Sequence, residues 1–190
     1  VGVTDGIGAV PAITSVTTGD SDSNGQIDRL TIVFDKNVDI ADGSAADGFP
    51  QVVVTGYAIA NADYAASGTT TLTLTLVESG GADTGATPQV TFTNDGDVRD
   101  VVTYAPAANY GPAAVSDGAG PAIVSAQTVT TTTVEVTFSE AVSDASLAVG
   151  DFVFAAFVTG GANTNPTGIT TGTADDAVAT LTLAAAIGPS

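Results

Sequence analysis

The sequence predicts an all-β protein that consists of two β-sandwich domains in tandem. Three observations lead to this fold class: the composition, an internal repeat, and the alternation of apolar and polar residues. The 190 residues are 44% hydrophobic, and Ala, Val, Leu and Ile occur among abundant Thr and Gly, a mixture that favours strands and tight turns over long helices. A chain of this length is suited to one large or two small domains.

An internal repeat divides the chain into two similar halves. Both copies contain the pattern V-[ST]-D-G-x-G, then P-A-I-x-S, then an alternating strand with Phe34 or Phe138, and finally Leu-Thr-Leu. The matching segments are 3–15 with 115–125, 30–39 with 134–143, and 74–76 with 181–183. Because the matches occur in one order, we expect domains at 1–116 and 117–190, and a period of about 110 residues is typical of a β-sandwich.

Short alternating stretches between Gly, Asp, Asn and Pro predict the strands of each copy. Leu30, Ile32 and Phe34 share one face of an extended chain, as in a half-buried antiparallel strand. The strands expected in the first copy are 12–18, 27–35, 51–56, 70–77, 89–93 and 98–104. Those expected in the second copy are 122–129, 133–138, 152–158, 168–171 and 178–184. No helical apolar stripe competes with them, so we expect two Greek-key sandwiches.

The second copy is shorter than the first after the last matching segment. Forty residues follow Leu76 up to Ser116, whereas seven follow Leu183. We therefore expect the second sandwich, 117–190, to lack its closing strands and to leave an edge of unpaired backbone groups. Either the natural chain continues, or a neighbouring molecule supplies a strand, for which Val1–Pro11 is the candidate segment.

An acidic insertion distinguishes the first copy. Nineteen positions separate Pro11 from Leu30, but thirteen separate Pro121 from Val134, and the additional residues fall in the segment D-S-D-S-N-G-Q-I-D. Its spacing is that of a calcium loop, in which a glycine makes the sharp turn and oxygens occupy alternate positions. The candidate ligands are Asp20, Asp22, Asn24, Asp28 and the backbone carbonyl of Gln26.

Hard oxygen ligands favour Ca²⁺ over Mg²⁺, which prefers a smaller octahedral shell. Thr31 stands where a calcium loop has its bidentate Glu, so one or two further ligands must come from elsewhere in the fold or from water. The alternative is a solvated turn, since Asp, Ser, Asn and Gly dominate turns in general. Segment 94–100 is also acidic; it could hold another ion or complete the first site, but an ordinary turn is favoured there. Asp5 and Asp117 occupy equivalent places at the entrances of the two copies, where a calcium ion between the modules and an Asx-type turn explain them equally well.

Charge and missing residue types exclude several function classes. The chain has 21 acidic and 3 basic residues, a net charge of −18, and no His, Cys, Met or Trp. Such a surface repels nucleic acid and attracts cations. Catalytic triads and zinc centres need His or Cys, and no apolar run reaches the roughly 18 residues of a membrane span. We therefore expect neither an enzyme, nor nucleic-acid binding, nor membrane insertion.

The order D-G-x-G-P-A-I-x-S-A followed by V-E-V-T-F-S-E-A-V, in residues 117–142, resembles the bacterial and archaeal Ig-like repeats of S-layer and large cell-surface proteins. Residues 27–39 are similar, although the second copy lacks the acidic loop. The resemblance implies Ig-like sandwiches in an extracellular structural protein.

Together these features predict a calcium-stabilised protein of the cell surface that self-assembles into an S-layer-like lattice or filament. Its partners would be further copies of itself, with cell-surface polysaccharide as another possibility. The alternative is a non-catalytic spacer or binding module of a secreted adhesin or multidomain hydrolase.

Overall fold

A computed structural model describes residues 9–41, 49–63, 67–78, 80–154 and 165–187. These residues form antiparallel strands almost throughout, and the short exceptions are the 3-10 turns η2 (Asp144–Ser146) and η3 (Val149–Asp151). The all-β fold class is therefore confirmed. No helix in the described part of the chain is long and apolar enough to cross a membrane.

The chain divides into two compact units. Unit 1 contains Val1–Asp22, Gln26–Gly81 and Ala86–Gly120, and unit 2 contains Ser23–Gly25, Ala82–Gly85 and Pro121–Ser190. The two short segments of unit 2 are joined by a hydrogen bond of 2.9 Å from the Asp83 N–H to the Gly25 carbonyl oxygen. Each unit is described separately below.

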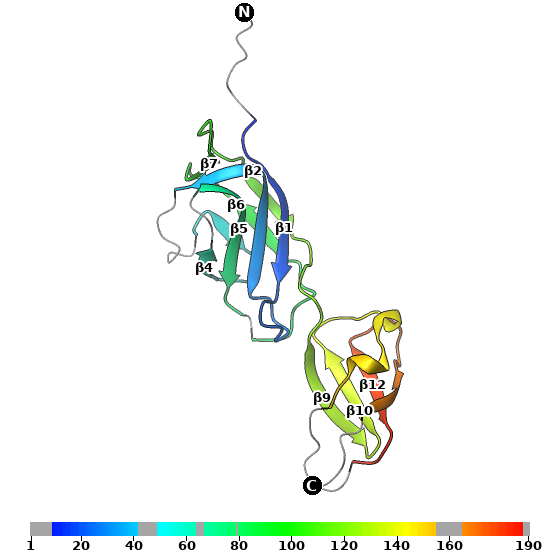
Figure 1. Cartoon of the computed structure of the whole chain (residues 1–190). Coiled ribbons are helices and arrows are strands. Elements are labelled where there is room, and N and C mark those ends of the chain that lie inside the picture. The colour runs from blue at the N-terminus through cyan, green and yellow to red at the C-terminus, as the bar shows by residue number, and fades with distance from the viewer. Residues whose placement is uncertain (1–8, 42–48, 64–66, 79, 155–164, 188–190) are drawn as a thin grey trace, which may run out of the picture. The chain divides into compact units, whose positions relative to one another are not determined.

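Unit 1 is a sandwich of two antiparallel sheets (Figure 1). The larger sheet has the order β1-β2-β5-β4, and β7 pairs with the far end of β2. Its strands are β1 (Ile13–Gly19), β2 (Arg29–Ile40), β4 (Ile59–Asp63), β5 (Ser67–Leu76) and β7 (Val98–Asp100). The smaller sheet has the order β3-β6-β8 and consists of β3 (Val52–Val54), β6 (Gln89–Phe92) and β8 (Tyr110–Ala114).

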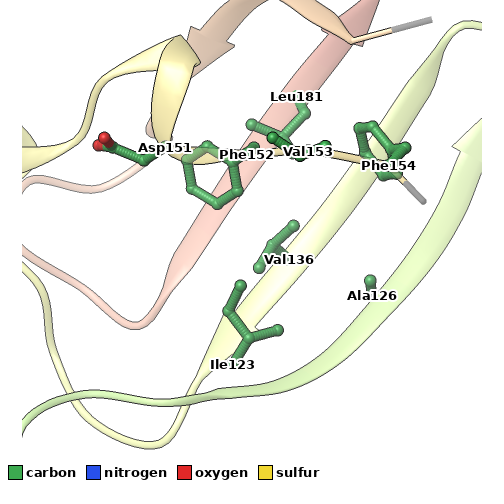
Figure 2. Close-up of a pocket in the computed structure, with 8 residues that line it drawn as sticks. All are labelled: Ile123, Ala126, Val136, Asp151, Phe152, Val153, Phe154 and Leu181. Carbon is green, nitrogen blue, oxygen red and sulfur yellow. The ribbon is translucent and has the colours of Figure 1, made fainter. Parts of the chain in front are cut away.

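Unit 2 has one four-stranded sheet among its described residues, in the order β11-β12-β10-β9. The strands are β9 (Ile123–Thr130), β10 (Thr133–Phe138), β11 (Pro166–Thr170) and β12 (Val178–Leu183). The segment Phe152–Phe154 crosses one face of this sheet near Val136 and Leu181 (Figure 2). Every residue of β9 is exposed.

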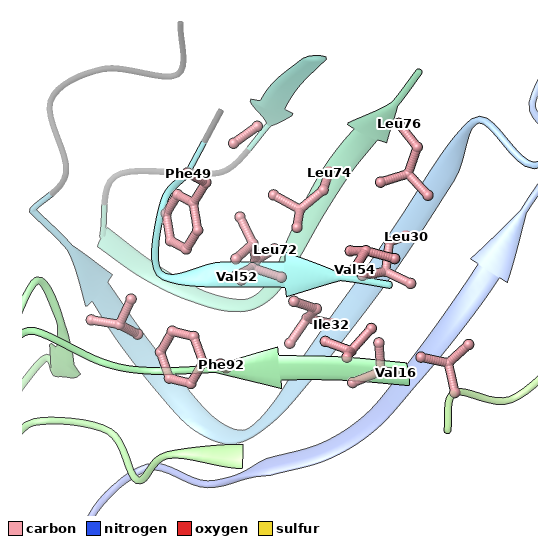
Figure 3. Packing of buried hydrophobic residues seen from close by; sticks show 14 of the residues in the cluster. Val16, Leu30, Ile32, Phe49, Val52, Val54, Leu72, Leu74, Leu76 and Phe92 are labelled. Carbon is pink, nitrogen blue, oxygen red and sulfur yellow. The ribbon is translucent and has the colours of Figure 1, made fainter. Parts of the chain in front are cut away.

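The core of unit 1 lies between its two sheets. Alternation along β2 places Leu30, Ile32 and Phe34 in the core, at 3% exposure or less. Strands β3 and β6 cover this face (Figure 3), and the Phe92 ring packs edge-on against Phe34 with centroids 6.3 Å apart. Further buried residues of the same cluster include Val16, Val38, Val52, Val54, Leu72, Leu74, Leu76, Val90 and Val98.

Unit 2 has a separate and smaller core. Its central residues are on β10 and β12, where Val136 and Leu181 are buried. Phe152 packs edge-on against Phe138 with centroids 6.4 Å apart. The two hydrophobic clusters share no residue.

Most predicted strands coincide with observed ones, with five differences. Strand β2 continues to Ile40, five residues beyond the end predicted at residue 35. The strand expected at 98–104 ends at Asp100, because the Asp100 carboxylate accepts hydrogen bonds from the Val102 and Thr103 N–H groups and closes a turn. In the stretch 152–158, residues 152–154 belong to no strand, and 155–158 lie outside the described residues. Strands β4 and β8 were not predicted.

Candidate metal centre

The acidic loop connects β1 to β2 at one end of unit 1. The Asp28 N–H donates to the Gly19 carbonyl oxygen at 3.1 Å, which closes the base of the loop. Ile27 is fully buried and anchors the loop in the core. Gly25 has φ +94°, a conformation that side-chain-bearing residues rarely adopt.

Asp28 is held in place from within the loop. Its Oδ1 accepts a hydrogen bond from the Ser21 N–H at 2.8 Å, and its Oδ2 accepts one from the Ser21 hydroxyl. The Asp28 carbonyl oxygen accepts a hydrogen bond of 2.7 Å from the Leu76 N–H. The end of β5 is thereby fixed beside the loop.

This contact brings a third carboxylate to the loop, two residues beyond β5. Carboxylate oxygens of Asp22, Asp28 and Glu78 all lie within 4.8 Å of one another. Asp28 is half-buried, and the other two are exposed. All three residues belong to unit 1.

Gln26 connects the loop to the segment that contains Glu78. Its side-chain oxygen accepts a hydrogen bond from the Gly80 N–H at 2.7 Å, and its Nε2 donates to Glu78 Oε2 at 3.4 Å. The sequence predicts a ligand at the backbone carbonyl of Gln26, and the structure adds that its side chain holds Glu78 and Gly80 beside the loop.

Of the three predicted carboxylate ligands, the structure brings Asp22 and Asp28 together. Gln26 contacts Glu78 of this group, while Asp20 is not a member of it; ligation by the Asn24 side chain and the Gln26 carbonyl stays a prediction. Glu78 was not predicted as a ligand, although the sequence does require a ligand from outside the loop. The signal that identifies it is the pairing of β2 with β5, in which Arg29 is opposite Thr75.

The arrangement of the three carboxylates suits a calcium ion. Ca²⁺ takes oxygen ligands at 2.3–2.6 Å, so two oxygens on one ion are at most about 5 Å apart. The 4.8 Å limit within this group satisfies that condition. The set consists of three carboxylates and contains no nitrogen or sulfur ligand, which is the ligand type that hard cations prefer. Water would complete the coordination shell.

The other acidic segments of the described residues form local turns. The Asn94 side-chain oxygen accepts hydrogen bonds from the Gly96 and Val98 N–H groups, and Asp117 accepts one from Ala119. These are turns of the kind that Asx side chains stabilise. The Arg99 guanidinium forms an ion pair of 3.0 Å with the Asp39 carboxylate on the neighbouring strand β2. Its charge is therefore directed toward β2. Asp5 lies outside the described residues.

Comparison with known proteins adds no relative. No protein-family model, curated protein or solved structure matches the chain. The resemblance to Ig-like repeats of cell-surface proteins therefore stays a prediction from the sequence, and the functional argument depends on the site and the fold.

Proposed function

We propose that the chain is a calcium-stabilised structural module of an extracellular assembly, in which copies join as a lattice or filament. The observation that supports calcium binding is the meeting of Asp22 and Asp28 with Glu78, which lies on a separate segment of the fold. A cation shared by the two segments would fix the β1–β2 connection to the end of β5. Metal binding to the folded state alone stabilises that state.

Charge supports the same function. With a net charge of −18, copies of the chain repel one another at low ionic strength, and divalent cations reduce that repulsion. Calcium would then act at two levels, on the stability of unit 1 and on the association of copies.

The experiment that tests this proposal follows assembly and stability in parallel. Purified protein is titrated with Ca²⁺, with Mg²⁺ as control at equal ionic strength, and examined by differential scanning calorimetry and negative-stain electron microscopy. We expect a higher Tm with Ca²⁺ and ordered arrays or filaments that a chelator disperses. A higher Tm without association would favour the spacer or binding module of a larger secreted protein. No change in either would contradict the proposed function.

A further inference from the structure

Gln51 is a buried residue of unit 1 whose side-chain oxygen is unsatisfied. It directly precedes β3 and is 6% exposed. Its backbone carbonyl oxygen accepts a hydrogen bond of 2.8 Å from the Thr93 N–H, which extends the pairing of β3 with β6. Its Nε2 donates to Asp95 Oδ2 at 3.0 Å, whereas its Oε1 has no hydrogen-bond partner in the described part of the chain. Because nearly all buried polar atoms of proteins are satisfied by protein, water or an ion, this oxygen indicates a bound species.

The Gln51 side chain points into the acidic turn, residues 94–97, that connects β6 to β7. Asn94 builds this turn with its side-chain amide, whose oxygen accepts from two N–H groups and whose nitrogen donates to two carbonyl oxygens. Asp95 Oδ1 accepts a hydrogen bond of 3.2 Å from the Asp97 N–H. The turn therefore holds the Asp95 carboxylate against the Gln51 amide, and a second carboxylate follows two residues later.

The three basic residues of the chain are engaged elsewhere. Arg99 pairs with a carboxylate of β2 at 3.0 Å, and Lys36 Nζ lies 4.0 Å from Asp100. Arg29 is the first residue of β2, at the end of that strand farthest from β7. In a chain with a net charge of −18, a cation from solution is left to balance the acidic turn.

We propose that Gln51 Oε1 and the Asp95 carboxylate are ligands of a second Ca²⁺ site in unit 1, to which Asp97 adds negative charge. Glutamine carbonyl oxygens and carboxylates are both calcium ligands. Oε1 and Nε2 are bonded to the same carbon, so Oε1 lies at most about 5 Å from Asp95 Oδ2, the largest separation of two oxygens on one calcium ion. One ion would thus satisfy the buried oxygen and neutralise the carboxylate, and water would complete its shell.

This second site is separate from the group of Asp22, Asp28 and Glu78. Asp28 directly precedes β2, whereas the acidic turn lies beside the other end of that strand, where the Ala41 N–H donates to the Asp97 carbonyl oxygen at 2.8 Å. The 12 residues of β2 lie between the two positions, a length of roughly 35–40 Å at 3.3 Å per residue. The second site therefore binds independently of the first, and it does not depend on the proposed assembly.

The second site should bind calcium weakly. Asp95 is exposed, and two protein ligands leave much of the coordination shell to water. We expect a Kd on the order of 10⁻⁴ to 10⁻³ M, the range of calcium sites in extracellular modules.

The test follows each site by its own signals in the complete chain. Protein labelled with ¹⁵N is titrated with Ca²⁺, with Mg²⁺ as control at equal ionic strength, and observed by two-dimensional ¹H–¹⁵N NMR. We expect the side-chain NH₂ signals of Gln51 and the backbone signals of residues 95–97 to shift with one Kd. Signals of residues 20–28 should shift with another Kd. Mg²⁺ should shift the first set less, because it prefers a smaller and more rigid shell.

Two substitutions remove the proposed ligands one at a time. Gln51→Met removes the oxygen at similar volume and should abolish the shifts of residues 95–97. Asp95→Asn keeps an oxygen that accepts from the Asp97 N–H and should raise the Kd about tenfold or more. Gln89→Met, exposed on β6, and Asp35→Asn, exposed on β2, are the matched controls and should leave the Kd unchanged.

The outcomes separate this site from the first one. Glu78→Gln should leave the shifts of Gln51 and residues 95–97 unchanged. Absence of these shifts at about 10 mM Ca²⁺, ten times the weaker Kd, would show that Gln51 Oε1 holds a water only and would overturn the proposal. An unchanged Kd in Asp95→Asn would overturn it too, and this variant decides the question if Gln51→Met fails to fold. In either case the signals of residues 20–28 still report on the first site.

Discussion

Glu78 is the residue on which the metal site depends most, because it comes from outside the loop. Its carboxylate lies beside Gln26, a residue 52 positions earlier in the sequence. The other two members of the site, Asp22 and Asp28, are held by the β1–β2 connection. Three carboxylates this close repel one another unless a cation is bound.

Replacing Glu78 by Gln should therefore have opposite effects with and without calcium. The side-chain oxygen that accepts from Gln26 is kept, but one negative charge is lost. Without calcium we expect a Tm equal to or above that of the wild type, because a repulsion is removed. With calcium at 100 times the wild-type Kd, the wild type gains about 2.7 kcal/mol, and the variant should gain less.

Isothermal titration with calcium measures the affinity directly, and calorimetry measures the Tm. The control is Glu135→Gln, which makes the same change on β10 in unit 2. Unchanged calcium affinity in the Glu78 variant would exclude Glu78 from the site. A lower Tm without calcium would indicate a structural role for its charge instead.

Asp100 contributes to the pH dependence of stability in unit 1. The Thr103 and Val102 N–H groups donate to its carboxylate and lower its pKa below the ordinary 3.8, with a smaller contribution from the Lys36 charge. A lowered pKa means that the folded state favours the ionised form. The stabilising contribution is complete above pH 3.8 and is lost as the pH falls through the lower value of the folded state.

Asp100→Asn keeps the accepting oxygen but removes the titration. We expect the free energy of unfolding of the variant to change less than that of the wild type as the pH is lowered from 5 to 2. Urea unfolding at a series of pH values measures the difference. Parallel curves for the two proteins would show that Asp100 has the same pKa in the folded and unfolded states.

Among the strands, β8 depends on one glycine for its close approach to β6. Gly111 has φ +81°, and a Cβ atom at this position would lie 2.1 Å from the Val90 carbonyl oxygen on β6. Gly111→Ala should therefore separate β8 from β6 and cost roughly 3 kcal/mol. Gly120→Ala is the control, because a Cβ atom there meets no atom within 4 Å. Urea unfolding measures both, and equal stability of the two variants would contradict this explanation.

The strands that the sequence predicts well are those with regular alternation. Strands β2, β5, β10 and β12 alternate buried apolar residues with Thr or charged residues, and this pattern is visible without the structure. Strand β8 contains Gly111 and Pro112, which argue against a strand locally, and its pairing with β6 overrides them. Strand β4 (I-A-N-A-D) has too few large apolar residues to show a period.

Part of the candidate metal site can likewise be predicted from the sequence, and part cannot. The loop half is local, and its Asp-x-Asp-x-Asn-Gly spacing is visible in the sequence. Glu78 becomes part of the site only through the antiparallel register of β2 and β5. No local pattern encodes that register, so the sequence predicts the need for another ligand but not its identity.

At the scale of the whole molecule, the two separate cores predict two unfolding transitions. Leu74→Ala removes a fully buried side chain from unit 1 and should cost about 2–5 kcal/mol. We expect calorimetry to show that this substitution lowers the Tm of one transition. Calcium should raise the Tm of that same transition. Val136→Ala, in the core of unit 2, should lower the Tm of the other transition. A single transition shifted by both substitutions would show that the units unfold together.

Strand β9 has a consequence for handling the protein. All eight of its residues are exposed, and none of them is charged or a proline, the usual means by which natural edges resist unwanted pairing. Within the strand itself nothing then opposes the lateral joining of two such edges, and the net charge of the chain is left to do so. Because the Debye length shrinks from about 10 Å at 0.1 M salt to about 3 Å at 1 M, concentrated brine should turn clear preparations cloudy while the fold stays intact.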